Sequence, residues 1–399
     1  MTTRVALLAE LGVSSIGNDA SAAQVIAMLE AGPGDVDVTI LSREPAAAQE
    51  ELGRPAWDAR ARWAYRGPMH ASGAAKVVRL VLDLIHLLRI AGRFDVIVVP
   101  GTGALEVGQG GLPRGTLLSL LLAGVAARCR RTPYLWLAVG GSRYSRRLTR
   151  WTVRAAAATA CIRSYRDVVT LEAVRSAGVD TSRDVLMDDV VIGRTALPPR
   201  RPEVQDGPVV VSVIDVPSAA GAPEATDEER RRYSGEICRF VAALLDRGER
   251  VRVVVSDAAD VAVARQVVEE ATRDRTSGTL TLRVPRNFDE VLRELAGARV
   301  VIGSRFHILI AAALDAVPFV AVEHADKVGI LSEDLGLGAY RVGAHTFRSE
   351  ELVGSLDAVT DKRDALSRDI SAWVDVARER TLHGYDEVLA RLERRGVTT

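Results

Sequence analysis

Short apolar runs alternate with longer helix-forming stretches through the first half of the chain. The apolar runs fall at 5–10, 37–41, 95–99, 134–139 and 159–162. The clearest helical stretches between them are 74–90, 116–128 and 144–158. Continuous apolar strands separated by helices predict a parallel sheet that is covered on both faces.

The same alternation restarts at residue 209. Asn287 is a good N-cap, with Glu290 three residues later, so a helix is expected to begin there. A last helix is predicted over about 370–395, interrupted or kinked near Gly384. The other predicted elements are strands at 209–214, 251–257, 280–285, 299–303 and 319–322, and helices at 228–247, 261–272 and 304–315.

A break in the pattern lies between residues 197 and 208, where four prolines and several charged residues (LPPRRPEVQDGP) indicate an interdomain linker. We therefore predict an α/β protein with two Rossmann-like domains facing a cleft. The domains are expected at 1–200 and 207–370, with a C-terminal helix at 371–399 that packs back on the N-terminal domain. Ligands of such sheets bind beyond the carboxyl ends of the strands.

Composition argues against several classes of function. Lys and Arg number 52, as do Asp and Glu, so no net charge draws the chain to nucleic acid or to an anionic membrane. Cys129, Cys161 and Cys238 are far apart, and no Cys/His cluster points to zinc or disulfides. The N-terminus lacks a signal-peptide pattern, and the apolar run at 117–127 is too short to span a bilayer. We expect a cytoplasmic protein without a transmembrane segment.

Lysine is rare in this chain. Lys76, Lys327 and Lys362 are its three lysines, and arginine supplies the other 49 basic residues. A GC-rich genome that replaces lysine codons with arginine codons accounts for the bias. A lysine kept beside a motif is nevertheless a candidate functional residue.

The strongest local signal is the segment 300–327, VVIGSRFHILIAAALDAVPFVAVEHADK. An apolar strand ends at Gly303, and a helix is expected to begin with Ser304 as its N-cap. Arg305 and His307 then lie in the first turn. The free N–H groups and the dipole there favour anions, and arginine adds a fork that matches carboxylate or phosphate oxygens. Read alone, the two residues are equally consistent with capping and solvating a helix start.

The next strand is followed by a second group of polar residues. Glu323, His324 and Lys327 are expected on the loop after the strand at 319–322. This loop is predicted to lie beside the start of the helix at 304–315. Three potentially cationic groups, Arg305, His307 and Lys327, would thus gather at the carboxyl ends of two neighbouring strands.

This segment resembles the C-terminal signature of the polysaccharide pyruvyltransferase family. The shared pattern is an apolar strand, Gly-x-Arg-x-His opening a helix, a strand led by proline, and a lysine shortly afterwards. Fainter matches occur in the N-terminal half. They are the run Arg166-Asp167-Val168-Val169-Thr170 with Gly178-Val179 following, Asp188 or Asp189, Gly17-Asn18, and Pro100-Gly101-Thr102-Gly103.

Two loops depart from the family pattern. The first reads Gly17-Asn18-Asp19-Ala20 and lacks the second glycine, and the second, Gly140-Gly141-Ser142, lacks a proline. Both lie in the N-terminal domain, which is the expected acceptor side. The departures therefore point to an unusual acceptor or to an activity that has drifted.

The resemblance implies a GT-B-like fold and transfer of a pyruvyl group from phosphoenolpyruvate to the hydroxyls of a saccharide or glycoconjugate, without a metal or other cofactor. His307 would be the acid that protonates C3, because the charge of histidine can change near neutral pH. Arg305 would hold carboxylate or phosphate, and Lys327 the leaving phosphate. Further substrate contacts are expected from Arg166, reaching across the cleft, and from Ser304, Glu323, His324, Asn18 and Asp19.

Two other functions stay open. A nucleotide-sugar-dependent glycosyltransferase would share the two-domain layout, although no clear Glu-x7-Glu is present in the second domain. A non-catalytic member that binds an anionic sugar is the third possibility. The acceptor, the type of product (ketal or enol ether) and the oligomeric state have no signal in the sequence.

Overall fold

The computed structural model describes residues 2–9, 15–61, 73–107, 115–194, 206–216, 225–273 and 278–397. The chain divides into two compact units. The first comprises Met1–Val13, Asn18–Gly193 and Glu379–Thr399, and the second comprises Ser14–Gly17 and Arg194–Arg378. Most of the predicted linker, residues 197–205, lies outside the described residues.

The described strands of the first unit form one parallel sheet in the order β3-β2-β1-β4-β5-β6-β7. They are β1 (Thr3–Leu8), β2 (Val36–Ser42), β3 (Ala56–Asp58), β4 (Val96–Val99), β5 (Tyr134–Val139), β6 (Ile162–Tyr165) and β7 (Val185–Leu186). The helices are α1 (Ile16–Glu30), α2 (Pro45–Leu52), α3 (Gly73–Ala91), α4 (Thr116–Arg130), α5 (Arg147–Ala157) and α6 (Val168–Ser176).

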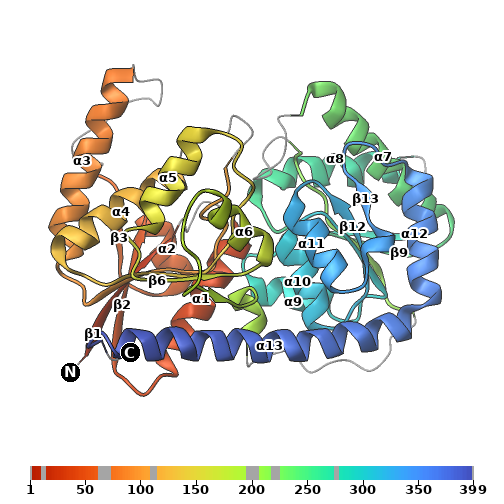
Figure 1. Cartoon of the computed structure of the whole chain (residues 1–399). Helices are drawn as coiled ribbons and strands as arrows, with labels where there is room; N and C mark the ends of the chain where they lie inside the picture. The colour runs from red at the N-terminus through yellow and green to blue at the C-terminus, as the bar shows by residue number, and fades with distance from the viewer. Residues whose placement is uncertain are drawn as a thin grey trace. The chain divides into compact units, whose positions relative to one another are not determined.

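The central strands β4 and β5 are buried along their whole length, so both faces of the sheet are covered there. Figure 1 shows α3, α4 and α5 on one side of the sheet, and α1 with the end of the C-terminal helix α13 (Arg363–Glu393) on the other. Alternate residues of one strand therefore enter different cores. In β4, Ile97 and Val99 pack with α3 and α4, while Val96 and Val98 pack with α1 and α13.

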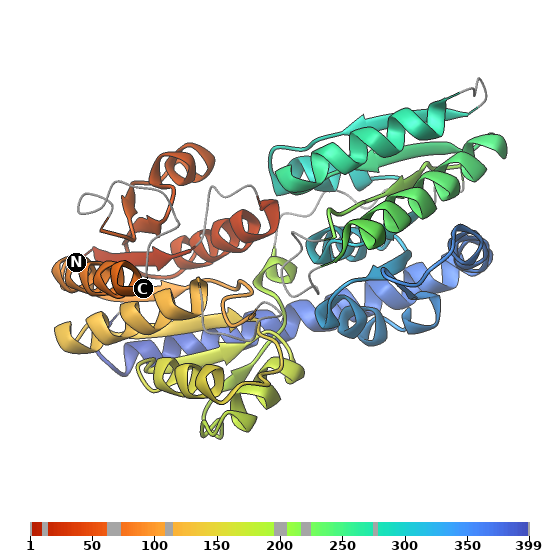
Figure 2. The ribbon, with the colours of Figure 1, turned by 90° about the horizontal axis from the view of Figure 1, so that it is seen from above.

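The described strands of the second unit form a parallel sheet in the order β10-β9-β8-β11-β12-β13. They are β8 (Val209–Val211), β9 (Arg250–Val254), β10 (Thr279–Arg283), β11 (Val300–Gly303), β12 (Phe319–Glu323) and β13 (Val342–Gly343). The helices are α7 (Asp227–Asp246), α8 (Val261–Thr272), α9 (Phe288–Leu295), α10 (Phe306–Leu314), α11 (Asp326–Asp334) and α12 (Ser349–Asp361), followed by the first part of α13. Figure 2 shows the ribbon from a second direction.

The second unit has a valine-rich core beneath α7, α8 and α12. Helix α7 is fixed at its start by a capping box, in which Thr226 accepts from the Glu229 N–H and Glu229 accepts from the Thr226 N–H. Its apolar face then buries Ile237, Phe240 and Leu244 against the strands. Such packing supplies most of the stability of a surface helix.

The predicted alternation of strands and helices is confirmed in both halves, and the fold class with it. The strand predicted at 159–162 is wrong, because β6 begins at Ile162. The Thr159 hydroxyl instead donates to the Ala156 carbonyl at the end of α5 (2.6 Å). The interruption predicted near Gly384 is also wrong. Helix α13 runs through this glycine, where an added Cβ would lie 2.7 Å from Cε of Met187.

No helix in the described part of the chain is long and apolar enough to cross a bilayer. The run at 117–127 that came nearest to this pattern belongs to α4. Its residues Leu117, Leu120 and Ala123 are buried against the first sheet.

Candidate functional site

The candidate site lies at the carboxyl edge of the second sheet. Strands β9, β8, β11 and β12 are neighbours in that order, and all are parallel, so their carboxyl ends lie along one edge. The loop after β9 carries Asp257 and Asp260, the turn after β11 carries Arg305, and the turn after β12 carries His324. The topology therefore gathers side chains that are far apart in the sequence.

Arg305 is held by a carboxylate that the sequence did not single out. Its Nε and Nη2 each donate to Asp260 at 2.7 Å, and Asp257 lies 3.6 Å from Nη2. Asp260 is fully buried and also accepts from the Asp215 N–H at 2.7 Å. Burial lowers the pKa of Arg305, but the hydrogen bonds and charge of Asp260 outweigh it and leave the pKa above its ordinary value.

The fork expected to grip a substrate anion is therefore occupied by Asp260, which leaves Nη1 of Arg305 as the remaining donor nitrogen. Two carboxylates beside one guanidinium also offset its charge. Arg305 is held rigidly, but it attracts an anion less strongly than an isolated arginine would.

The ring of Phe306 contacts both His307 and Lys327, the two other predicted catalytic residues. Its ring meets the His307 imidazole edge to face, with centroids 5.3 Å apart and planes at 84°. The Lys327 Nζ lies 6.0 Å from the centroid of the same ring, at the range of a cation–π contact. Lys327 is in the first turn of α11 rather than on the predicted loop. His307 and Lys327 thus contact the ring of one phenylalanine, and Arg305 directly precedes it in the chain. We call these four residues the cationic cluster.

Gly17, near the start of the chain, lies directly against the imidazole of His307. Ser15 forms a bridge with Asp257, and the Ile16 N–H donates to the Ser256 carbonyl at 3.3 Å. These contacts place Gly17 so that an added Cβ would lie 2.0 Å from Nδ1 of His307. Only a residue without a side chain fits here, so the glycine noted in the first loop serves the site through its missing Cβ.

His324 is buried beside the cationic cluster. It is 7% exposed, and its Nδ1 has no hydrogen-bond partner within the described residues. Burial, reinforced by the charges of Lys327 and Arg305, lowers the pKa of His324 to about 3. The imidazole is therefore neutral at physiological pH.

Two predicted substrate contacts have partners inside the second unit. The Ser304 hydroxyl is fully buried and lies 3.1 Å from the Tyr233 hydroxyl. Because it is engaged there, the prediction of Ser304 as N-cap is wrong, and the N-cap of α10 is Arg305. Glu323 pairs with Arg341 at 3.1 Å. Burial raises the pKa of Glu323 above its ordinary value, which the charge of Arg341 partly opposes.

The remaining predicted residues belong to the first unit. Arg166 is buried among three carboxylates, with Glu106 at 3.1 Å and Asp167 and Asp189 at 3.5 Å. These carboxylates offset its charge, and Gly140 makes room for its guanidinium. Asn18 and Asp19 lie in the first turn of α1 and not in a loop as predicted. Their contact with substrate, like that of Arg166, stays a prediction.

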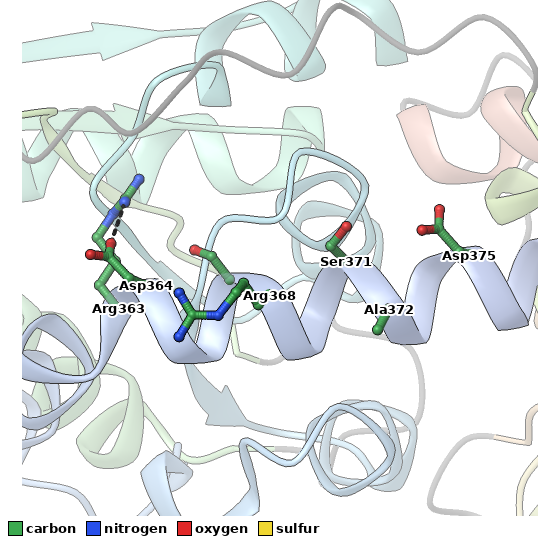
Figure 3. Close-up of a pocket in the computed structure, with 7 residues that line it drawn as sticks. Arg363, Asp364, Arg368, Ser371, Ala372 and Asp375 are labelled. Carbon is green, nitrogen blue, oxygen red and sulfur yellow. Dashed lines mark hydrogen bonds and ion pairs between the residues drawn. The ribbon is translucent and has the colours of Figure 1, made fainter.

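An open hollow elsewhere in the second unit has no residue in common with this site. It runs along one side of α13 (Figure 3), and Arg363 pairs there with Asp364 at 3.3 Å. A hollow lined by a single helix does not enclose a small ligand. Among the described residues, no three His, Cys, Asp or Glu side chains are grouped as a metal ion requires.

Solved structures similar to this chain include UDP-N-acetylglucosamine 2-epimerases and a galactosyltransferase. A putative UDP-N-acetylglucosamine 2-epimerase from Listeria monocytogenes has a TM-score of 0.63 at 11% identity, covering 93% of this chain and 91% of that one. The UDP-GlcNAc 2-epimerase from Neisseria meningitidis bound to UDP-GlcNAc has a TM-score of 0.57 at 11% identity, covering 96% and 100%. The lipopolysaccharide outer core galactosyltransferase WaaB has a TM-score of 0.55 at 11% identity, covering 96% and 98%.

These similarities establish that the two parallel-sheet units have the GT-B fold. Identities this low carry no information on substrate. A comparison with curated protein sequences gives no significant match. The model of the polysaccharide pyruvyl transferase family, in contrast, matches residues 16–326, which is more than half of the chain and includes Gly17, Arg305 and His307. The chain therefore belongs to the polysaccharide pyruvyl transferase family.

Proposed function

We propose that the chain transfers a pyruvyl group from phosphoenolpyruvate to hydroxyls of a saccharide or glycoconjugate and releases inorganic phosphate. One observation carries the proposal: His307 and Lys327 both contact the Phe306 ring, and Arg305, the residue before it, is held by Asp260 at the carboxyl edge of the second sheet. Membership of a transferase family supports the type of reaction.

The donor would be held by side-chain and backbone charge. Phosphoenolpyruvate carries a carboxylate and a phosphate. Helices α10 and α11 both begin at this edge, and the positive end of a helix dipole favours a nearby anion. Because Asp260 and Asp257 offset the charge of Arg305, we assign the larger share of the attraction to Lys327. Arg305 would orient one oxygen through Nη1.

The chemistry needs one proton donor near C3 of the enol. His307 would give a proton to C3 and leave an oxocarbenium-like centre at C2. An acceptor hydroxyl would add to C2 and lose its own proton. A second hydroxyl would then displace phosphate from C2, with breakage of the C2–O bond, and its proton would balance the released phosphate. A positioned acid is worth about 10²–10⁴-fold in rate.

His324 would act as a neutral hydrogen-bonding group in this scheme. Its lowered pKa depends partly on the charges of Lys327 and Arg305. A bound anion would offset those charges and raise the pKa of His324. The residue would therefore hold a proton more readily in the complex than in the free protein.

A nucleotide-sugar-dependent transfer is the competing function, because the Neisseria relative of this fold is bound to UDP-GlcNAc. A thermal-shift assay separates the two. We expect phosphoenolpyruvate to stabilise the protein in the presence of EDTA, and UDP to have little effect. Stabilisation by UDP alone, or by phosphoenolpyruvate only with Mg²⁺ or Mn²⁺, would overturn the proposal. Phosphate release with an acceptor present then distinguishes an enzyme from a binding protein.

A further inference from the structure

The outer surface of the first unit carries an unusual number of exposed apolar side chains. Helices α3, α4 and α5 pack side by side on one face of the first sheet (Figures 1 and 2). Of the ten large apolar side chains exposed in the described residues, six lie on α3 and α5. They are Val77 (61% exposed), Val78 (56%), Val81 (51%), Ile85 (38%), Leu148 (53%) and Trp151 (63%).

Within each helix, the spacing of these residues places them on the same face. Val77, Val81 and Ile85 are four residues apart and form one stripe along α3. Leu148 and Trp151 are three apart on α5 and therefore share a face of that helix. Exposed apolar side chains gathered on one face of a protein are a feature of interaction sites.

Nearly all the charged residues of α3, α4 and α5 are basic. These helices hold eight basic residues and one acidic residue, Asp83. The chain as a whole has equal numbers of acidic and basic residues, so the balance hides a local excess. The basic residues are Lys76, Arg79, Arg89, Arg128, Arg130, Arg147, Arg150 and Arg154. We call the exposed residues of α3, α4 and α5 the basic-apolar face.

We propose that the basic-apolar face binds the surface of an anionic lipid bilayer. Arginine beside exposed tryptophan, leucine and valine is typical of helices that lie in the membrane interface. A second copy of this face would bring like charges together. A nucleic acid would match the charge but leave the aliphatic stripe of α3 in water. The inference concerns the first unit only and does not depend on the proposed chemistry.

Flotation with vesicles of phosphatidylcholine, alone or mixed with phosphatidylglycerol, tests the proposal with the full-length protein. We expect binding to the mixed vesicles, little binding to phosphatidylcholine alone, and loss of binding at high salt. The double change Leu148→Ser with Trp151→Ser should lower the partition coefficient about tenfold or more. The matched control is Val376→Ser, which removes a valine that is 52% exposed on α13 in the second unit.

Charge is tested by Arg147→Glu, which should lower the partition coefficient about fivefold or more. Arg265→Glu on α8 makes the same change at an exposed position of the second unit and should have a much smaller effect. Both arginines are exposed, so neither change threatens the core.

Quenching by brominated phospholipids then locates the contact. Trp151 should be quenched by anionic brominated vesicles, and Trp151→Phe should bind while losing most of that quenching. The proposal is overturned if wild type does not bind, if neutral vesicles bind equally well, or if Leu148→Ser with Trp151→Ser binds like Val376→Ser. It is also overturned if Trp151→Phe is still quenched, or if the face proves to join two copies of the chain or to retain nucleic acid instead.

Discussion

Replacing Gly17 with alanine should disable His307 without changing any group that takes part in the chemistry. The new Cβ would lie 2.0 Å from Nδ1, 2.5 Å from Cγ and 2.6 Å from Cε1 of the imidazole. Carbon atoms in contact are about 3.5–4.0 Å apart. The imidazole of His307 must therefore move by more than about 1 Å to relieve the overlap.

A displacement of this size is enough to be seen in the rate. A misplacement of about 1 Å at a catalytic group can cost about 10²-fold. None of the nearest atoms to the new Cβ belongs to Arg305 or Lys327, so the affinity for phosphoenolpyruvate should change little. We therefore expect kcat to fall by about 10²-fold while KM for phosphoenolpyruvate stays within a few-fold of the wild-type value.

The assay is phosphate release from phosphoenolpyruvate with an acceptor. Gly354→Ala is the control, since this glycine of α12 has no atom within 4 Å of an added Cβ. A double variant of Gly17→Ala with His307→Gln should be no slower than the slower single variant, because both act through one group. If Gly17→Ala is as active as Gly354→Ala, or if the two effects multiply, the assignment of His307 is refuted.

Three other predictions follow from the same geometry. His307→Gln should lower kcat far more than it raises KM for phosphoenolpyruvate, and a change in KM alone would make His307 a binding residue. Lys327→Arg should lower kcat/KM, because a wide guanidinium replaces a compact ammonium beside Phe306. The control variants Lys76→Arg and Lys362→Arg should keep the wild-type kcat/KM. Equal activity of all three variants would make Lys327 incidental. His324→Gln should make the free energy of unfolding less sensitive to acid. The pKa of His324 is about 3 in the folded protein against an ordinary value of 6.5. The contribution of the neutral imidazole to stability is therefore full above about pH 6.5 and is lost as the pH falls toward 3. Urea unfolding at pH 7 and pH 5 should show a loss of about 2 kcal/mol in wild type that is absent from His324→Gln, and equal losses would contradict this.

Much of the fold follows from the sequence because the central strands, which are covered on both faces, are apolar along most of their length. The runs at 300–303 and 319–322 are buried along their full length, which is why their pattern predicted β11 and β12. Helix α1 had no such signal. Its first turn contains Gly17, Asn18 and Asp19, which are poor helix formers and favour a loop interpretation.

The site was predictable only in part, for a physical reason. Arg305, His307 and Lys327 lie in one short segment, 300–327, whose strand–helix–strand pattern can be recognised from the sequence alone. Asp260 and Gly17 reach the same site through the topology of the sheet. Asp260 carries no sequence signal, because it contributes a buried carboxylate to a distant arginine. The faint family match at Gly17 did not reveal that its missing side chain makes room for His307.

A crystal structure with phosphoenolpyruvate soaked in tests the central claim most directly. We expect the donor at the carboxyl edge of the second sheet, with its phosphate or carboxylate within hydrogen-bond distance of the Lys327 Nζ and Nη1 of Arg305, and its C3 carbon facing His307. Density for the donor away from the cationic cluster, or an empty cluster at saturating phosphoenolpyruvate, would contradict the account.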